Sequence, residues 1–366
     1  MPFSAFVEAA LYDPESGFFM TGGGAGRAGR DFVTSPEVGP LFGACLARAL
    51  DSWWRALGEP DPFLVVEAGA GTGRLCREVL RGTPECAPAL RYVLVERSTA
   101  LRDAQRELLT IEPFEHALGP SSPGIGGDAS VPVARTGPIV TALDELPAIT
   151  FDGVILANEL LDNLPFDVVE RVDAGWTEIR VGVDDAGRFH EVPVPVAEEL
   201  AAWLGGFTVP DGARLPVQRA AEEWIDVCAN QIHRGVVLVL DYAAGLDDLI
   251  TRGRGWLRTY RGHERGGDPL DEPGSRDITA DVLLEPLRRA ATRAGFTIAD
   301  ECTQAEWLTA LGIDELVAEG RARWRAGAAR GDLDALAGRS RATEAAALID
   351  PAGLGAHTAL TLTKGL

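Results

Sequence analysis

Patterns that bind metals or form disulfide frameworks are missing from this sequence. Its five cysteines are an odd number, lie far apart and include no C-x-x-C pair. This spacing argues against a disulfide scaffold and against a structural zinc site. The five histidines are also scattered and show no H-E-x-x-H spacing. We interpret them as surface or core residues and expect no metal centre.

Long apolar runs are missing as well. No run approaches the roughly 20 residues that a membrane-spanning helix needs, so we expect no membrane span. The first 17 residues have no charged stretch followed by an apolar one, as a secretory signal would. They also lack the Arg-rich, acid-poor composition of an organelle transit peptide. From these residues we expect a cytoplasmic location.

Positive charge is scarce. The chain has 34 Lys and Arg against 55 Asp and Glu, a formal net charge of −21 over 366 residues. A protein this acidic repels phosphate backbones, so we expect no nucleic-acid partner. The charge favours a cationic substrate or partner, although acidity also serves solubility.

Short apolar strands alternate with helical patterns along the chain. This alternation predicts an α/β, Rossmann-like fold with a mostly parallel sheet and helices on both faces. The strands are continuous Val/Ile/Leu runs, as expected where both faces are buried. They are Phe63–Gly69, Arg91–Glu96, Gly153–Asn158 and Gly235–Ala243, with two more predicted within Gly295–Thr303 and His357–Gly365.

Residues 167–196 follow a different pattern. Apolar and polar residues alternate there, and turn-forming residues separate the segments. This predicts an antiparallel β meander inserted into the α/β core. Helices are predicted next at Ala197–Leu204 and Gln218–Ile232. Leu118–Pro132 is rich in Gly, Ser and Pro and is predicted to be a loop without a function.

Glycines follow the first predicted strand directly. The sequence VVEAGAGTGRL places Gly69, Gly71 and Gly73 where the backbone can approach a ligand closely. The G-x-G-x-G spacing differs from that of dinucleotide binders. Glu67 precedes the loop, where it would repel a pyrophosphate but attract an ammonium group. Glu96 ends the next strand, where its carboxylate can accept both ribose hydroxyls. This combination predicts S-adenosylmethionine, the alternative being a tight turn beside two incidental acids.

Several blocks of the sequence then allow a comparison with a known family. GRDFVTSPEVGPLFG, VEAGAGTGRL, LVERS, ANELLDNLPFDVVER and LRTYRGHERGGDPLDEP occur in this order. Together they resemble the MidA family of S-adenosylmethionine-dependent methyltransferases over nearly the whole chain. The resemblance implies a class I methyltransferase fold and S-adenosylhomocysteine as a product. Because the family includes a mitochondrial assembly factor of respiratory complex I, it also implies methylation of a protein arginine.

The sequence departs from the family pattern at a few positions. Arg30 stands where the family usually has Gly, and Ala70 replaces a frequent Pro in the glycine loop. Leu160, Leu161 and Asn163 occupy the places of two Phe and an Ala. These changes leave the cofactor residues intact. The loss of two aromatic residues leaves open whether the substrate is a protein or a small molecule.

Polar residues crowd the end of the strand Gly153–Asn158. The carboxyl ends of parallel strands meet at one edge of a sheet, so this cluster should face the methyl group of the cofactor. Two carboxylates can pair with the donor fork of a guanidinium. We therefore interpret Glu159 and Asp162 as the acceptor clamp and Asn158 as a positioning group. The alternative is a polar turn ended by Pro165. Asp241 and Tyr242 end another strand and are secondary candidates.

The block DFVTSPEV has the features of a helix start. Thr34 or Ser35 can cap it, and Pro36 suits the first turn. The resemblance implies that this segment also folds over the cofactor, after a mobile glycine loop. The Arg-rich segment Leu257–Pro269 is either a solvated loop or a lid over the substrate channel. The glycines that we expect to make the preceding loop mobile are Gly22–Gly24, Gly26 and Gly29.

We therefore divide the chain into an N-terminal segment and cofactor lid, residues 1–52, and a catalytic domain, residues 53–366. Insertions are predicted at 167–233 and 245–280. The predicted activity is methylation of arginine in a protein substrate that presents a cationic or Arg-bearing segment, and an oligomer is possible. The alternatives are a non-catalytic assembly factor and a small-molecule methyltransferase. The predicted cofactor residues are Thr34, Ser35, Glu67, Gly69, Ala70, Gly71, Gly73 and Glu96.

Overall fold

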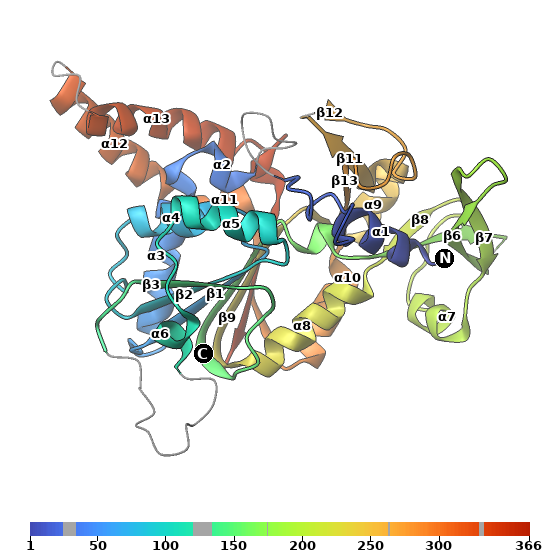
Figure 1. Ribbon diagram of the computed structural model, residues 1–366, viewed down its shortest axis with the longest axis horizontal. Helices are drawn as coiled ribbons and strands as arrows, with labels where there is room; N and C mark the ends of the chain where they lie inside the picture. The colour runs from blue at the N-terminus through green and yellow to red at the C-terminus, as the bar shows by residue number, and fades with distance from the viewer. Residues whose placement is uncertain (25–33, 120–133, 174, 263, 329–332) are drawn as a thin grey trace.

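A seven-stranded sheet in the order β15-β16-β9-β4-β1-β2-β3 forms the centre of the molecule (Figure 1). The computed structural model describes residues 1–24, 34–119, 134–173, 175–262, 264–328 and 333–366. Among the described strands of this sheet, β16 runs in the direction opposite to the other six. The predicted mostly parallel α/β sheet is confirmed. Its strands are β1 (Phe63–Ala68), β2 (Leu90–Val95), β3 (Ile139–Leu143), β4 (Phe151–Asn158), β9 (Ile232–Asp241), β15 (Thr297–Thr303) and β16 (Thr358–Lys364).

Helices cover both faces of this sheet. Successive side chains of a strand point to opposite faces, so Val65 of β1 packs into one hydrophobic core and Val66 into another. The first core contains α3 (Pro40–Ala56), α4 (Arg74–Arg81), α11 (Gln304–Ala310), α12 (Ile313–Gly327) and α13 (Leu333–Leu348). The second contains α8 (Arg219–Gln231) and α10 (Leu284–Arg293). The short helices α5 (Thr99–Leu108) and α6 (Phe114–Leu118) connect β2 to β3.

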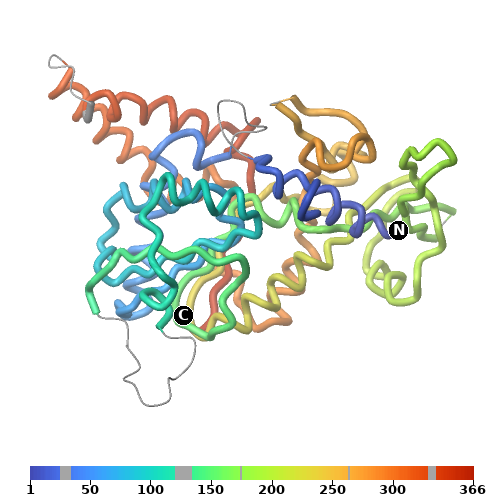
Figure 2. The backbone as a smooth tube through the Cα atoms, viewed as in Figure 1, coloured from blue at the N-terminus to red at the C-terminus, as the bar shows by residue number. Residues whose placement is uncertain are grey.

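A second lobe lies to the right of the central sheet in Figures 1 and 2. Its four-stranded antiparallel sheet has the order β7-β6-β5-β8, which confirms the predicted meander and adds a fourth strand. The strands are β5 (Asp167–Val172), β6 (Gly175–Val183), β7 (Phe189–Pro195) and β8 (Arg214–Val217), with α7 (Glu198–Leu204) before β8. A smaller sheet of β11 (Leu257–Arg261), β12 (Glu264–Arg265) and β13 (Asp277–Ala280) lies nearby, after α9 (Leu246–Arg252). Two short strands, β10 (Ala243–Ala244) and β14 (Val282–Leu283), pair with each other.

The packing of two segments bears on the domain boundaries predicted from the sequence. Helix α8 falls inside the predicted insertion 167–233, yet Trp224 and Ile225 pack beneath the central sheet with Val66. From this packing we propose that the insertion ends with β8. Residues 1–52 are divided between two cores, because α1 (Phe3–Tyr12) packs on the second lobe, where the Phe3 and Phe166 rings lie 5.7 Å apart, whereas α3 packs on the central sheet.

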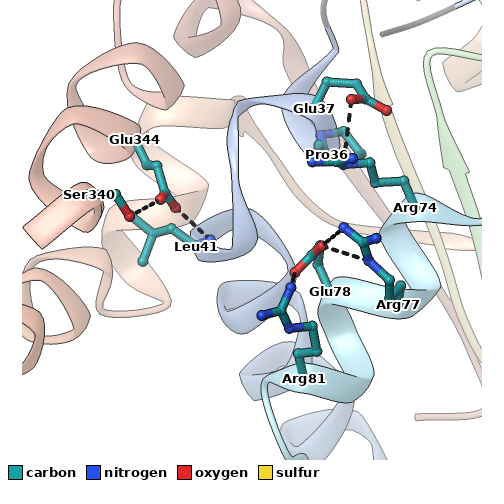
Figure 3. Close-up of polar contacts among 9 residues, drawn as sticks. All are labelled: Pro36, Glu37, Leu41, Arg74, Arg77, Glu78, Arg81, Ser340 and Glu344. Atoms are coloured by element: carbon teal, nitrogen blue, oxygen red, sulfur yellow. Dashed lines mark hydrogen bonds and ion pairs between the residues drawn. The ribbon is translucent and has the colours of Figure 1, made fainter. Parts of the chain in front are cut away.

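Polar contacts hold the short helix α2 (Ser35–Val38) in place from two sides (Figure 3). On one side, the Glu344 carboxylate of α13 accepts hydrogen bonds from the Leu41 backbone N–H at 3.0 Å, in the first turn of α3 directly after α2, and from the Ser340 hydroxyl at 2.5 Å. On the other side, Arg74 Nε donates to the Pro36 carbonyl at 3.3 Å and lies 3.4 Å from the Glu37 carboxylate. These contacts fix α2 beside the first turn of α4.

Some features named from the sequence lie outside the described residues. These are Gly26, Gly29 and Arg30, and Leu118–Pro132 apart from its first two positions. Within the described part of the chain, no helix has both the length and the apolar character required to cross a bilayer. In the same part, no group of three or more His, Cys, Asp and Glu side chains could hold a metal ion.

Candidate active site

A cavity of about 580 Å³ opens at the carboxyl ends of β1, β2, β3 and β4. In parallel α/β sheets, ligands bind at this edge. The cavity brings together most residues that the sequence singled out. Those lining it are Thr34, Glu67, Gly69, Ala70, Gly71, Glu96, Asn158 and Glu159. Ser35, Gly73 and Asp162 lie behind its wall.

The glycine loop depends on backbone conformations that side chains resist. Gly69, Gly71 and Gly73 have φ angles of 70°, 52° and 77°, in the left-handed region that glycine tolerates. A Cβ on Gly69 would meet Leu160 Cδ1 at 2.9 Å, whereas a Cβ on Gly71 would have nothing within 4 Å. Gln105 Nε2 donates to the Gly71 carbonyl at 2.8 Å. Gly71 is therefore held rigidly while its outer side stays open to the cavity.

Glu96 ends β2 and supports the same loop. Its Oε2 accepts a hydrogen bond from Gly71 N at 2.9 Å, and its Oε1 accepts one from Ser98 N at 2.8 Å. Burial raises the pKa of this carboxyl, and the two backbone donors oppose that shift. Each carboxylate oxygen has a further lone pair, so Glu96 can accept hydrogen bonds from ligand hydroxyls while it holds the loop.

Glu67 lies at the floor of the cavity. The Tyr92 hydroxyl donates to its Oε2 at 2.6 Å, and the Cys76 backbone N–H donates to the same carboxyl. Burial raises the pKa of Glu67 to about 8. A carboxyl that burial keeps protonated regains its charge when a cation binds beside it, which suits a site for a cationic group.

Glu159 follows β4 in an unusual backbone conformation. Its φ angle is 51°, which is rare for a residue with a side chain and is often found at functional sites. Its backbone N–H donates to the Leu240 carbonyl at 2.8 Å. Its carboxyl accepts hydrogen bonds from the Ser35 backbone N–H and, at 3.4 Å, from Asn158 Nδ2. Burial, followed by the nearby Asp162 charge, raises its pKa to about 8.

Two of the predicted residues support the cavity from behind. The buried Ser35 hydroxyl donates to Gln304 Oε1 at 2.8 Å, so Ser35 reaches the site only through its backbone contact with Glu159. Asp162 is 3% exposed and accepts a hydrogen bond from the Thr279 hydroxyl. Its predicted role as a direct substrate clamp therefore needs revision, because its carboxyl is buried below Glu159.

Several lining residues were not found from the sequence. Arg74 begins α4 and borders the cavity with Glu37. Tyr12 comes from α1, where its ring stacks on Phe19 at 5.6 Å and lies 4.5 Å from the Arg97 guanidinium. Arg97 follows Glu96 directly, so the strand end was a usable signal for it. No local pattern marks Tyr12, since only the tertiary fold brings α1 to the cavity.

Comparison with known proteins identifies the family. Residues 45–301 match the model of a family of S-adenosyl-L-methionine-dependent methyltransferases. The chain belongs to this family. A solved relative of this methyltransferase, a superfamily member from Burkholderia thailandensis bound to S-adenosylhomocysteine, is 32% identical. The superposition covers 100% of this chain and 88% of that one, with a TM-score of 0.82.

Curated relatives are named as enzymes. Protein arginine methyltransferase NDUFAF7, mitochondrial, from Xenopus tropicalis is 30% identical over 85% of this chain and 72% of its own length. The homologue from Drosophila melanogaster is 29% identical over 81% of this methyltransferase and 67% of its own length. Both names state a mitochondrial location. The cytoplasmic location expected from the amino terminus is therefore contradicted.

Three features of the cavity fit the cofactor of this family. The space above Gly71 is open. Carboxyl groups from Glu67, Glu96 and Glu159 line the cavity, which suits a ligand with an ammonium group, a ribose and a sulfonium charge. Asn158 Oδ1 is buried and, among the described residues, has no hydrogen-bond partner. An unpaired buried acceptor is costly, and a ligand donor in the cavity would satisfy it.

Proposed function

We propose that this enzyme transfers methyl groups to arginine side chains of a protein substrate. The observation that carries the proposal is the Glu159 carboxyl, which a strained backbone presents to the cavity at the end of β4. A carboxylate pairs well with the planar donor fork of a guanidinium. The names of the curated relatives support the same acceptor.

We assign the cofactor to the part of the cavity between the glycine loop and Glu96. Glu96 receives the ribose hydroxyls, and the Gly69–Gly71 backbone passes close to the ligand. Glu67 faces the ammonium group, and Arg74 at the start of α4 receives the carboxylate of the amino-acid portion. Thr34 closes the cavity from the N-terminal side. Ser35 and Gly73 act indirectly, through Glu159 and the start of α4.

The acceptor then occupies the side of the cavity beside Glu159. S-adenosylmethionine supplies the methyl group as an electrophilic sulfonium substituent. Glu159 holds the guanidinium in plane and takes up the proton that its nitrogen loses on methylation. Asn158 orients the acceptor or the cofactor through its unpaired Oδ1. The acidic cavity attracts a cationic side chain, in keeping with the net charge of −21.

Methyl-labelled S-adenosylmethionine tests the acceptor directly. The purified enzyme is incubated with the labelled cofactor and a lysate, and the protein fraction is hydrolysed to amino acids. We expect the label in methylated arginine. Label in small molecules would favour a small-molecule methyltransferase. Binding of the cofactor with no transfer to any fraction would favour a non-catalytic assembly factor.

Replacing Glu96 tests the ribose assignment. In Glu96→Ala, charge-assisted hydrogen bonds worth roughly 1.5–3 kcal/mol each are lost. We expect affinity for S-adenosylhomocysteine to fall by about 10- to 100-fold, measured by calorimetry. Glu96→Ala also frees the Gly71 and Ser98 N–H groups, so folding is checked by circular dichroism. Asp103→Ala, an exposed acid of α5, is the charge control. Unchanged affinity in folded Glu96→Ala would refute the assignment.

A further inference from the structure

A buried polar cluster lies directly behind Glu159. It joins four segments of the chain, namely the turn after β4, the end of β9, strand β11 and the end of β13. Its members are Asp162, Asp241, Arg258, Thr279 and Asp281, each less than one-tenth exposed. Of these five residues, only Asp162 belongs to the polar sequence that follows β4, so the cluster depends on the tertiary fold.

Asp241 fixes the turn that follows Glu159. Its Oδ2 accepts hydrogen bonds from Leu160 N at 3.1 Å and from Leu161 N at 2.8 Å. Its Oδ1 accepts one from Tyr242 N at 2.8 Å. The two residues after Glu159 are therefore tied to the end of β9. These hydrogen bonds hold the backbone of Glu159 in the left-handed region, which a residue other than glycine adopts only with strain.

Asp162 lies against Asp241 on the buried side of the same turn. Its Oδ2 accepts a hydrogen bond from the Thr279 hydroxyl. Its Oδ1 is buried and finds no donor among the described residues. Asp241 accepts a hydrogen bond from the N–H of Leu161, the residue directly before Asp162, and its side chain interacts with the Asp162 carboxyl. Two ionised carboxylates cannot share such a buried contact, whereas one proton between them turns repulsion into a strong hydrogen bond.

We propose that Asp162 and Asp241 share one proton, and that this shared hydrogen bond holds the turn that presents Glu159 to the methyl acceptor. Both are positioning residues, since neither reaches the cavity. The role of Glu159 toward an acceptor rests on the proposed function. The shared proton does not, because it belongs to the protein without any ligand.

The surrounding charges are consistent with a single shared proton. Burial raises the pKa of both carboxyls of the pair. Arg258 and Arg252 both pair with Asp281. Two guanidiniums therefore face three carboxyl groups, and one proton on the Asp162–Asp241 pair balances the charges.

The other groups facing the pair add no positive charge. The Tyr242 ring lies 4.8 Å from the Arg258 guanidinium and 3.9 Å from the His357 ring. Burial lowers the pKa of His357 to about 4, so this ring is neutral at pH 7. The other polar groups around the pair are acidic or neutral, namely Glu159, Asp277, Asn163, Thr279 and Tyr260.

Infrared spectroscopy of the ligand-free protein tests the shared proton directly. Glu67 and Glu159, whose pKa values burial raises to about 8, contribute C=O bands of their own. The spectra are therefore compared as a difference in which every protein also carries Glu159→Gln, so that the Glu67 band cancels, and one C=O band of a buried protonated carboxyl should be present without Asp162→Asn and missing with it.

In Asp162→Asn the new amide can donate to Asp241 and still accept from Thr279, so the turn is preserved and Asp241 ionises. Asp103→Asn, which changes an exposed carboxylate, should leave the band unchanged. An identical protonated-carboxyl band with and without Asp162→Asn in the folded protein would overturn the proposal.

Kinetics test the positioning role. Asp241→Asn cannot accept all three backbone hydrogen bonds, so kcat should fall by about 100-fold, as for a misplaced catalytic group. Affinity for S-adenosylhomocysteine should hold, because the glycine loop is untouched. In wild type, loss of the shared proton at high pH should lower kcat, and Asp162→Asn should lack this alkaline decline. If kcat of Asp162→Asn declines at high pH as in the wild type, the positioning role of the pair is refuted.

The two proposals fail in different ways. If methylation of arginine is not found, the infrared difference that Asp162→Asn causes still reports the shared proton. If that difference is missing while arginine is methylated, only the carboxyl pair is refuted.

Discussion

Glu159→Gln is expected to reduce kcat by roughly 10,000-fold or more, because a misplaced acceptor costs about 100-fold and loss of a base adds at least as much. Gln keeps the size of the side chain, but it removes the charge that holds a guanidinium and the oxygen that accepts its proton. Affinity for S-adenosylhomocysteine should change little, since Glu96 and the glycine loop hold that ligand in our proposal.

The pH dependence of the wild-type enzyme gives a second measure of the same group. Burial raises the pKa of Glu159 to about 8, and only the ionised form can act as a base. The value of kcat/KM, which reports the free enzyme, should therefore rise as the pH increases through about 8. A bound guanidinium favours the ionised form, so the corresponding rise in kcat should lie at lower pH. The rise of kcat/KM and the rise of kcat with pH should both be missing in Glu159→Gln.

A matched control tests whether the position of the Glu159 charge matters, rather than only the loss of one negative charge at the cavity. Glu145 is exposed and also borders the cavity, but it follows β3 rather than β4. Glu145→Gln makes the same change in net charge, and at saturating cofactor its kcat should stay near the wild-type value. If Glu159→Gln instead loses cofactor affinity and turnover in parallel, Glu159 is a cofactor ligand. If it keeps its activity, the polar turn has no catalytic role.

The central sheet was predictable because burial on both faces leaves a plain signal. The runs that became β1, β2, β4 and β9 are continuous Val/Ile/Leu segments, and the meander has an equally clear alternation. Strand β3 was missed, because it is a short edge strand whose last two residues are only partly buried. Helix α8 was predicted at the right place in the chain, but its packing on the central sheet could not be predicted, since an amphipathic pattern does not say which sheet a helix covers.

The site was predictable where a residue acts next to its own strand end. Glu96, Gly71 and Glu159 each follow a strand closely, and all three line the cavity. Residues whose roles depend on distant partners could not be found in this way. Tyr12 reaches the cavity from α1, and the orientation of Asp162 is set by Thr279, more than 100 positions later in the chain. The position of Asp162, three residues after Glu159, gave no indication that Thr279 would be its partner.

Gly71→Val should abolish measurable binding of S-adenosylhomocysteine. A Cβ on Gly71 meets no protein atom within 4 Å, so the valine methyls would extend into the cavity and occupy space that we assign to the cofactor. The left-handed φ of 52° adds strain of about 1–2 kcal/mol for a residue with a side chain. The fold should survive this cost, because Gly71 lies on the cavity wall rather than in a hydrophobic core.

Gly187→Val provides the matched control for this strain. Gly187 has a φ of 78°, and a Cβ on it would likewise have nothing within 4 Å, but it lies in the turn between β6 and β7, away from the cavity. Both variants should lose similar thermal stability, and only Gly71→Val should lose the ligand in calorimetry. Wild-type affinity in folded Gly71→Val would mean that the glycine loop is only a strand–helix turn. Equal loss of affinity in Gly187→Val would mean that general destabilisation, rather than occupied space, removes the ligand.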